Sequence, residues 1–472
     1  MTNRAVDRSQ LNELTSMWQA PGLIPTLVAV LSAFGGWSLL MPVIPQAILD
    51  GGGGTSLAGA YTGFFMAATV ATQTQTPRML RSLGYGTTMF ISGLFLGVPT
   101  LLHLFGTDAW LVLIIAVLRG MGFGALTVAE SALIAELVPL KFLGKASGSL
   151  GVAVGIAELI FLPLGLIIVD SVGSYAPVYI IGTIISVIGS AMALLIPKLK
   201  AAPATKKKGA QQGADDADAN ALPSVATYKL VAVPAVAIST IAMGFGGISA
   251  FLAPAARDMD VVSGSIVAGF ALSVLGGSQM VFRYLAGVYA DRRSRAGQLM
   301  APALFSGVIG LALMALVVQT GISVWVLLIA AVFYGAGFGI VQNEALLLMF
   351  ARLPKERTAE ASAIWNMAFD SGTGIGSFLL GAIAAAALSP YPAVFTVAAL
   401  LVIVGLAGAI VDAFIGRHRV AEYNNTRATL KKLSDKVKPV ANRVKPVASK
   451  VKPVASKIKP VAIKSNKADK GK

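Results

Sequence analysis

The chain has 472 residues, of which 56% are apolar and 13% are charged, with a mean hydropathy of +0.75. About a quarter of the residues in an ordinary soluble protein are charged, so this composition excludes a soluble globular protein. A spanning helix needs about 20 residues, and roughly twelve apolar stretches of that length are present. Runs such as 110–117 and 394–410 are apolar on all sides, which excludes the alternating pattern of an outer-membrane barrel. We predict an all-α membrane protein.

Twelve membrane-spanning helices are predicted. Residues 1–23 form a polar cytoplasmic lead-in that lacks the apolar core of a signal peptide. The first six helices are expected in a bundle over 24–197, at about 24–46, 57–76, 85–105, 109–135, 147–169 and 176–197. The second six are expected in a bundle over 229–415, at about 229–253, 263–287, 298–319, 324–350, 361–387 and 392–415. Between them, 198–228 is rich in Ala, Gly and Pro, which predicts a disordered cytoplasmic linker.

Positive charge in the loops gives the orientation. Lys and Arg are retained on the cytoplasmic side of a membrane. One set of loops carries nearly all of them: Arg78, Arg81, Lys141, Lys145, Arg292, Arg293, Arg295, Arg352, Lys355 and Arg357. The opposite set carries Arg257 alone. We therefore predict a multi-pass protein of the plasma (inner) membrane with both termini in the cytoplasm.

The two halves of the chain repeat each other. A shift of 215 positions places Trp110 on Trp325 and the Gly-Phe-Gly of 122–124 on that of 337–339. It also superposes Pro139 on Pro354 and Ser147 on Ser362. A shift of 211 places the Phe-Gly-Gly of 34–36 on that of 245–247. Because the matches fall in the same predicted helix of each half, two homologous six-helix bundles explain them better than chance does.

Twelve helices in two repeated halves with a long central linker resemble the major facilitator superfamily, over residues 24–415. The most specific motif is Gly287 to Arg295, GVYADRRSR, which is similar to the family loop G-x-L-A-D-R-x-G-R. The resemblance implies a conformational latch of Gly287, Asp291, Arg292 and Arg295. In it Gly287 permits close helix packing, and Asp291, beside a helix end, pairs with arginines. The first half has Thr76 in the place of the acid, so its latch is expected to be weak or replaced.

Two glycine-rich helices resemble elements of proton-linked drug exporters. Arg119, followed by glycines at 120, 122 and 124, is similar to the family's R-x-x-x-G element. Gly151 and Gly155, ahead of Pro163 and Gly165, partly match the antiporter signature G-x-x-x-G-P-x-x-G-G. The resemblance implies export. The small-residue spacing of Gly151 and Gly155 is also explained by helix packing alone.

Carboxylates inside the predicted helices are the candidates for proton coupling. Glu130, Glu344 and Asp412 lie near helix ends, where structural roles suffice. Glu158 and Asp370 lie deeper, in corresponding helices of the two halves. Charged residues at such depth mark ion pathways or relays, so we predict proton coupling by these two acids with Arg119 as a cationic neighbour. The alternative is a neutral, hydrogen-bonded acid that ties helices together.

Few other chemistries are open to this sequence. It has no cysteine, and its two histidines, His103 and His418, lie near a predicted helix end and in the final tail. We therefore expect no metal site, and a carboxylate rather than an imidazole as the proton carrier. Polar or stacking contacts to a substrate are predicted for six residues, although packing also explains each: Trp37, Gln342, Asn343, Glu344, Trp365 and Asn366.

The C-terminal tail holds most of the net charge. From Arg417 onward, 17 Lys and Arg stand against three acids, a net +14 of the total +16. Residues 438–461 repeat Lys-Pro-Val-Ala every seven positions, with the apolar spacing of an amphipathic helix. Proline costs about 3 kcal/mol inside a helix, so we expect residues 416–472 to be disordered and to bind anionic inner-leaflet lipid. Nucleic-acid binding is the rival interpretation, and the lack of interleaved aromatics disfavours base stacking but not phosphate attraction.

Together these features predict a secondary active transporter rather than an enzyme. No G-x-x-x-x-G-K-[ST] motif is present, which excludes an ATPase within this chain. We expect no cofactor, and a monomer that exports a small molecule in exchange for protons. A proton-coupled importer is one alternative. A membrane scaffold whose basic tail recruits lipid or a partner is the other.

Overall fold

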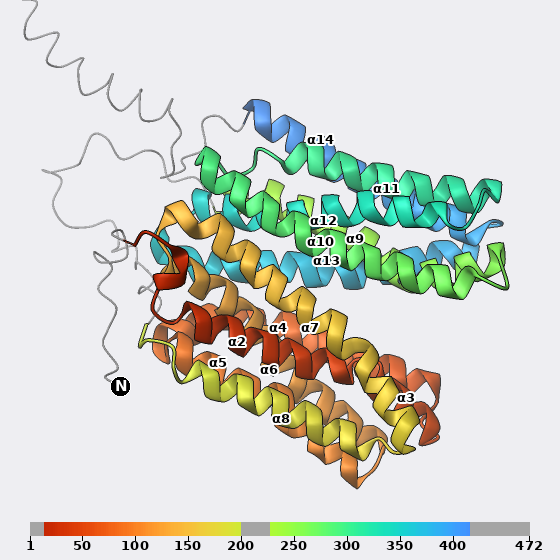
Figure 1. Ribbon diagram of the computed structural model, residues 1–472, viewed down its shortest axis with the longest axis horizontal. Coiled ribbons are helices and arrows are strands. Elements are labelled where there is room, and N and C mark those ends of the chain that lie inside the picture. Colours follow the sequence, from red (N-terminus) through yellow and green to blue (C-terminus); the bar gives the residue numbers. More distant parts are fainter. Residues whose placement is uncertain (1–13, 200–226, 416–472) are drawn as a thin grey trace, which may run out of the picture. The chain divides into compact units, whose positions relative to one another are not determined.

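The computed structural model describes residues 14–199 and 227–415, and its helices are shown in Figure 1. The first bundle contains α2 (Leu23–Leu40), α3 (Val43–Asp50), α4 (Gly54–Ser82), α5 (Tyr85–Gly97), α6 (Ala109–Leu137), α7 (Leu143–Val172) and α8 (Ala176–Ala193). The second contains α9 (Thr227–Met259), α10 (Gly264–Arg293), α11 (Met300–Thr320), α12 (Val326–Arg352), α13 (Thr358–Ala386) and α14 (Pro390–Ile415). Short 3₁₀ turns are η1 (Met17–Gln19), η2 (Val98–Phe105), η3 (Leu140–Phe142) and η4 (Lys355–Arg357).

The predicted all-helical fold is confirmed. Eleven spans of the described chain are long and apolar enough to cross a membrane, and α4 is the twelfth helix. The predictions for 1–13, most of the linker and the tail concern residues outside the described ranges. All the described helices belong to one compact unit.

Proline interrupts the first span, which the sequence predicts as one helix over 24–46. Helix α2 ends at Leu40 and α3 begins at Val43. Pro42 between them lacks an N–H and its ring clashes with the preceding turn, so the helix stops and restarts. The two pieces still form one apolar crossing, Leu23–Asp50.

Each bundle has its own hydrophobic core, and the two cores repeat each other. In the first, the rings of Phe34 and Phe123 have centroids 5.4 Å apart. In the second, Phe245 and Phe338 meet at 5.1 Å. The shift of 211 superposes Phe34 on Phe245, and the shift of 215 superposes Phe123 on Phe338. The same aromatic contact therefore occurs once in each bundle, which confirms the two repeated bundles.

Close glycine contacts give the correspondence between α4 and α10. Helices α6 and α12 correspond at the shift of 215, which pairs Gly120 with Gly335. A Cβ on Gly120 would strike the backbone of Phe65, and a Cβ on Gly335 would strike that of Leu275. Phe65 and Leu275 are 210 positions apart, so α4 and α10 correspond at 210. Arg81, not Thr76, therefore occupies the place of Asp291 in the repeat.

A buried ion pair joins three helices of the second bundle. Arg352 in α12 pairs with Asp412 in α14, and their side chains are 8% and 7% exposed. Arg352 also donates to the carbonyl of Leu230 in α9 at 3.0 Å. This pair holds the ends of the three helices together.

Removing one partner of this pair should be costly. We expect Asp412→Ala to lower the free energy of unfolding by about 3–5 kcal/mol, because it leaves the Arg352 guanidinium buried without its carboxylate. Thermal unfolding of the purified protein in detergent measures the loss. The double variant Arg352→Met/Asp412→Leu should recover most of it, and a larger loss in the double variant would contradict the prediction.

Candidate functional site

The two bundles meet along two sets of helices. Helix α7 of the first bundle packs on α10 of the second, and α4 and α6 of the first pack on α13 of the second. Helices α7 and α13 correspond in the repeat, as do α4 and α10. The two interfaces are therefore repeat-related, and differences between them are informative.

At the α7/α10 interface, Asp291 caps the start of α7. Its Oδ1 accepts from the amide of Gly144 at 2.7 Å and its Oδ2 from the amide of Lys145 at 2.8 Å. A helix N-terminus carries partial positive charge and attracts a carboxylate. Arg292 and Arg295 are exposed. The structure thus corrects the expected pairing of Asp291 with arginines, since backbone amides of the other bundle take their place.

Gly287 lies where the predicted latch needs a small residue. A Cβ built on Gly287 would collide with the carbonyl of Gly144, and one built on Gly144 would collide with the carbonyl of Gly287. The two backbones therefore touch one turn from Asp291. This contact brings the Asp291 carboxylate within reach of the α7 amides.

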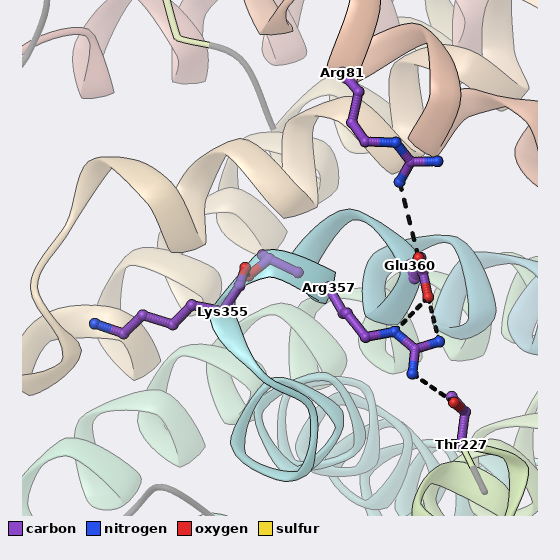
Figure 2. Close-up of polar contacts among 6 residues, drawn as sticks. Arg81, Thr227, Lys355, Arg357 and Glu360 are labelled. Carbon is purple, nitrogen blue, oxygen red and sulfur yellow. Dashed lines mark hydrogen bonds and ion pairs between the residues drawn. The ribbon is translucent and has the colours of Figure 1, made fainter. Parts of the chain in front are cut away.

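At the α4/α13 interface, Glu360 takes the central place, as Figure 2 shows. It lies 3.8 Å from Arg81 of the first bundle and accepts from Arg357 Nε at 2.7 Å. Arg357 also donates to Thr227 Oγ1 at 2.6 Å, whereas Lys355 points away from the group. Glu360 thus joins an arginine from each bundle.

The polarity of these two contacts is reversed between the repeats. Asp291 of α10 corresponds to Arg81 of α4 at the offset of 210, and Lys145 of α7 corresponds to Glu360 of α13 at 215. Lys145 also acts electrostatically on Asp291. One interface therefore has its acid on α10 and its base on α7, and the other has its base on α4 and its acid on α13. The sequence signal for this arrangement was the exchange of charge at both positions of the repeat: Arg81 stands in the place of Asp291, and Glu360 in the place of Lys145.

A polar seam continues from Glu360 along one face of α13. Ser362 bonds to Ser131 and donates to the carbonyl of Val128 at 2.8 Å. Asn366 Nδ2 donates to Ser131 Oγ at 3.2 Å. Residues four apart share a helix face, so Ser362, Asn366 and Asp370 all face the first bundle. Asn366 is consequently an interface residue.

Asp370 ends this seam. Its Oδ2 accepts from Gln73 Nε2 at 2.5 Å, and the Asp370 residue is half-buried. Gln73 of α4 corresponds to Arg283 of α10 at the offset of 210. Asp370 is therefore bonded to a neutral amide, whereas the corresponding position of the α7/α10 interface holds an arginine.

Arg283 is the centre of a polar cluster drawn from both bundles. It is 8% exposed, and its Nη1 donates to Gln342 Oε1 of α12 at 3.3 Å. Its guanidinium lies 5.8 Å from the ring centroid of Trp365 in α13. Across the interface it interacts electrostatically with Glu130 of α6 and Glu158 of α7.

The glycine spacing of α7 makes room for this arginine. A Cβ on Gly151 would collide with the Arg283 side chain. Among the described residues, no ion pair within 4.0 Å joins Arg283 to Glu130 or Glu158, so the charges act on one another without direct contact.

Several buried polar atoms of the cluster lack a hydrogen-bond partner. These are Arg283 Nε, Glu130 Oε2 and Trp365 Nε1. Leaving a buried polar group unsatisfied costs about 1–3 kcal/mol, so each such atom requires an explanation, such as an ordered water, a bound ion or a functional role. The cluster has unused hydrogen-bonding capacity at the meeting point of five helices.

Comparison with known proteins agrees with this architecture. The family model described as Major Facilitator Superfamily matches residues 26–377. The chain belongs to the major facilitator superfamily. It is a transporter and not an enzyme, and no curated protein matches it at the sequence level.

Solved structures share the fold of this transporter at low identity. A variant of the E. coli fucose:proton symporter FucP is 17% identical, with a TM-score of 0.63, covering 84% of this chain and 98% of that one. FucP in the outward conformation is 16% identical, with a TM-score of 0.64 and coverages of 84% and 99%. The human organic anion transporter MFSD10 is 13% identical, with a TM-score of 0.65 and coverages of 84% and 100%.

Arg119 does not join the Arg283 cluster. It is buried within the first bundle, where its Nε donates to the carbonyl of Leu96 at 3.0 Å and its Nη1 to the hydroxyl of Tyr61. The cation that acts on Glu158 is Arg283. His103 lies beside this group, buried against Tyr61 with ring centroids 6.2 Å apart.

The predicted substrate contacts separate into three places. Trp37 stacks on Phe123 in the first bundle at 5.0 Å. Gln342 and Trp365 join Arg283. Asn343 and Glu344 are fully buried, and the Glu344 carboxylate faces the amides of residues 297–299 ahead of α11. Sequence reasoning missed Arg283, although a lone arginine in an otherwise apolar helix was a usable signal.

Proposed function

We propose that this transporter is a proton-coupled exporter of a small molecule and works by alternating access. One observation carries the proposal: Arg283 of the second bundle is buried against Gly151 of α7, the first-bundle helix that carries Glu158 two turns further on. The two bundles must move relative to each other during transport. Protonation of Glu158 removes its attraction to Arg283, so proton occupancy biases the equilibrium between bundle arrangements.

The contacts of Asp291 and Glu360 are proposed to hold one end of the transporter closed. Both lie at the end where Lys and Arg crowd the loops, which the positive-inside rule assigns to the cytoplasm. The described arrangement is then the one closed to the cytoplasm in a plasma membrane. To open this end, the two bundles must break three sets of contacts: the Asp291 cap on α7, the Arg81–Glu360 pair and the hydrogen bonds of the polar seam along α13.

We propose export as the direction of transport. Export is supported by the resemblance of Arg119 and the glycines of α7 to exporter motifs. Import is the second candidate, because FucP, which shares the fold, is a proton symporter.

Vesicle transport tests both the coupling and its direction. Compounds that accumulate differently in deletion and overexpressing cells are first identified across a metabolite panel and then used as substrates. An exporter should concentrate such a compound in inside-out vesicles with an acidic lumen, with protons leaving as it enters. Uptake driven instead by external acid in right-side-out vesicles would establish import. Absence of substrate-dependent proton movement would favour the scaffold alternative.

A further inference from the structure

A second buried polar group lies inside the first bundle. Arg119 of α6 is 2% exposed, and its Nη1 donates to the hydroxyl of Tyr61 in α4. The ring of His103 in η2 lies 6.2 Å from that of Tyr61 and 5.3 Å from that of Tyr179 in α8, measured between centroids. Thr100 is buried one 3₁₀ turn before His103, on the same face of η2. These five residues form the Arg119 site.

The positive charge of this site has no carboxylate beside it. Within residues 14–199 and 227–415, no acid lies within 4.0 Å of the Arg119 guanidinium. Asp50, at the same end of the bundle, is exposed and accepts from the hydroxyl of Tyr175. Arg119 itself donates to neutral oxygens, those of Leu96 and Tyr61. Burial of an ion without a counter-ion is strongly destabilising, so a negative charge is needed here.

Hydrogen-bonding groups of the site also lack partners. In the described chain, both ring nitrogens of His103 and the hydroxyl oxygen of Thr100 are buried without a hydrogen bond. The Tyr61 oxygen accepts from Arg119, so its own hydrogen is left to donate. Buried groups of this kind indicate an ordered water or an ion. Water satisfies hydrogen bonds but carries no charge, whereas an anion also neutralises the arginine.

The repeat allows the same place to be found in the second bundle. Helices α6 and α12 correspond at an offset of 215, and α4 and α10 at 210. The segment of α5 and η2 corresponds to α11 at 211, because a Cβ on Gly122 would strike the amide nitrogen of Leu96 and one on Gly337 would strike that of Gly307. Helices α8 and α14 correspond at 216, where the Tyr-x-x-Val-Tyr of 175–179 matches the Tyr-x-x-Val-Phe of 391–395.

None of the five counterparts in the second bundle is charged. The counterparts of Arg119, Tyr61, Thr100, His103 and Tyr179 are all fully buried, and they are Tyr334, Ala271, Leu311, Met314 and Phe395. The one polar group among them, the Tyr334 hydroxyl, donates to the carbonyl of Ile241. The fold therefore packs at this place without a charge, and packing alone does not explain the polar set of the first bundle.

We propose that the Arg119 site binds one small monovalent anion. The ion lies against the Arg119 guanidinium and accepts from the Tyr61 hydroxyl and from an N–H of His103. Each of the five side chains is at most 6% exposed, so a halide fits this site better than an organic carboxylate does. The inference concerns the interior of one bundle and does not depend on the direction or the coupling of transport.

Exchange of gluconate for chloride tests binding. The thermal unfolding midpoint of the purified full-length transporter in detergent is measured at constant pH and ionic strength, with gluconate as the anion too large for the site. We expect a saturable rise of the midpoint with chloride, because a ligand that binds only the folded state stabilises it. Bromide should act in the same way. A midpoint that stays constant as chloride approaches molar concentration would overturn the proposal.

Matched Tyr→Phe substitutions locate the effect. Tyr61→Phe removes one donor to the ion and should raise the dissociation constant of chloride at least about tenfold, the effect of losing one hydrogen bond to a charged group. Tyr334→Phe makes the same change at a buried tyrosine of the second bundle and should leave that constant unchanged. An unchanged constant in Tyr61→Phe, or an equal change in both variants, would contradict the assignment.

Two further measurements fix the place of the ion. Arg119→Met should abolish the response to chloride, and if it does not fold, His103→Met, which takes the residue of the second bundle, should weaken chloride as Tyr61→Phe does. Anomalous diffraction from crystals of the full-length transporter grown in bromide should show one peak in contact with Arg119, Tyr61 and His103. A chloride response that survives in folded Arg119→Met, or a bromide peak only elsewhere, would show an adventitious ion only and overturn the site.

Discussion

Glu158→Gln is expected to abolish acceleration of transport by a pH gradient while leaving substrate exchange without a gradient. Glutamine keeps the shape of the side chain but can neither lose a proton nor attract Arg283 as an anion. Coupling free energies between linked sites are about 1–3 kcal/mol, so the gradient-driven rate should fall by about 5–150-fold. The measurement is uptake into inverted vesicles with and without a pH gradient, using a substrate from the metabolite panel.

Asp370→Asn separates the two candidate carboxylates. Asp370 is bonded to a neutral amide, Gln73, so its protonation changes no interaction with a cation there. We expect a smaller loss of gradient-driven uptake than in Glu158→Gln. Glu344→Gln is the control for an acid outside the cluster. Wild-type gradient-driven rates in both Glu158→Gln and Asp370→Asn would remove both residues from the coupling mechanism.

Asp291→Asn is expected to shift the balance of conformations toward opening of the α7/α10 interface. The carboxylate makes two charge-assisted bonds to the start of α7, and hydrogen bonds to charged groups contribute about 1.5–3 kcal/mol each. Asparagine retains one acceptor oxygen, so the loss of one bond should shift the balance by about 1.5–3 kcal/mol, a factor of about 10–150 in population. Folded yield should change little, because both bonds join bundles rather than helices of one bundle.

The natural absence of cysteine makes this shift measurable. Spin labels on exposed Arg78→Cys and Lys355→Cys report the separation of the two bundles at this end by pulsed electron resonance. Arg81→Gln provides the comparison from the other interface. Its pair with Glu360 is 22% and 27% exposed, so a smaller shift of about 0.2–1 kcal/mol is expected. An unchanged distance distribution in Asp291→Asn would rule out the latch.

Local features of the sequence were enough for the fold. Apolar runs long enough to cross a bilayer predict helices, because a backbone in lipid must satisfy its hydrogen bonds within each segment. The small side chain of Gly287 was likewise predicted to serve close packing. The break at Pro42 was missed, and a proline alone does not decide such a break, because Pro77 and Pro163 lie inside the unbroken helices α4 and α7.

The partners of the buried charges were decided by tertiary structure. Arg119 and Arg283 both lie within apolar stretches of helix, and nothing local shows that one stays within its bundle while the other lies at the interface between the bundles. Likewise, α6 and α12 correspond at an offset of 215, but α4 and α10 correspond at 210. Those five residues exceed one helical turn, so they replace Thr76 by Arg81 as the counterpart of Asp291. Sequence determined which stretches are helical and apolar, whereas the rotation and sliding of packed helices determined which charges are buried and which of them meet.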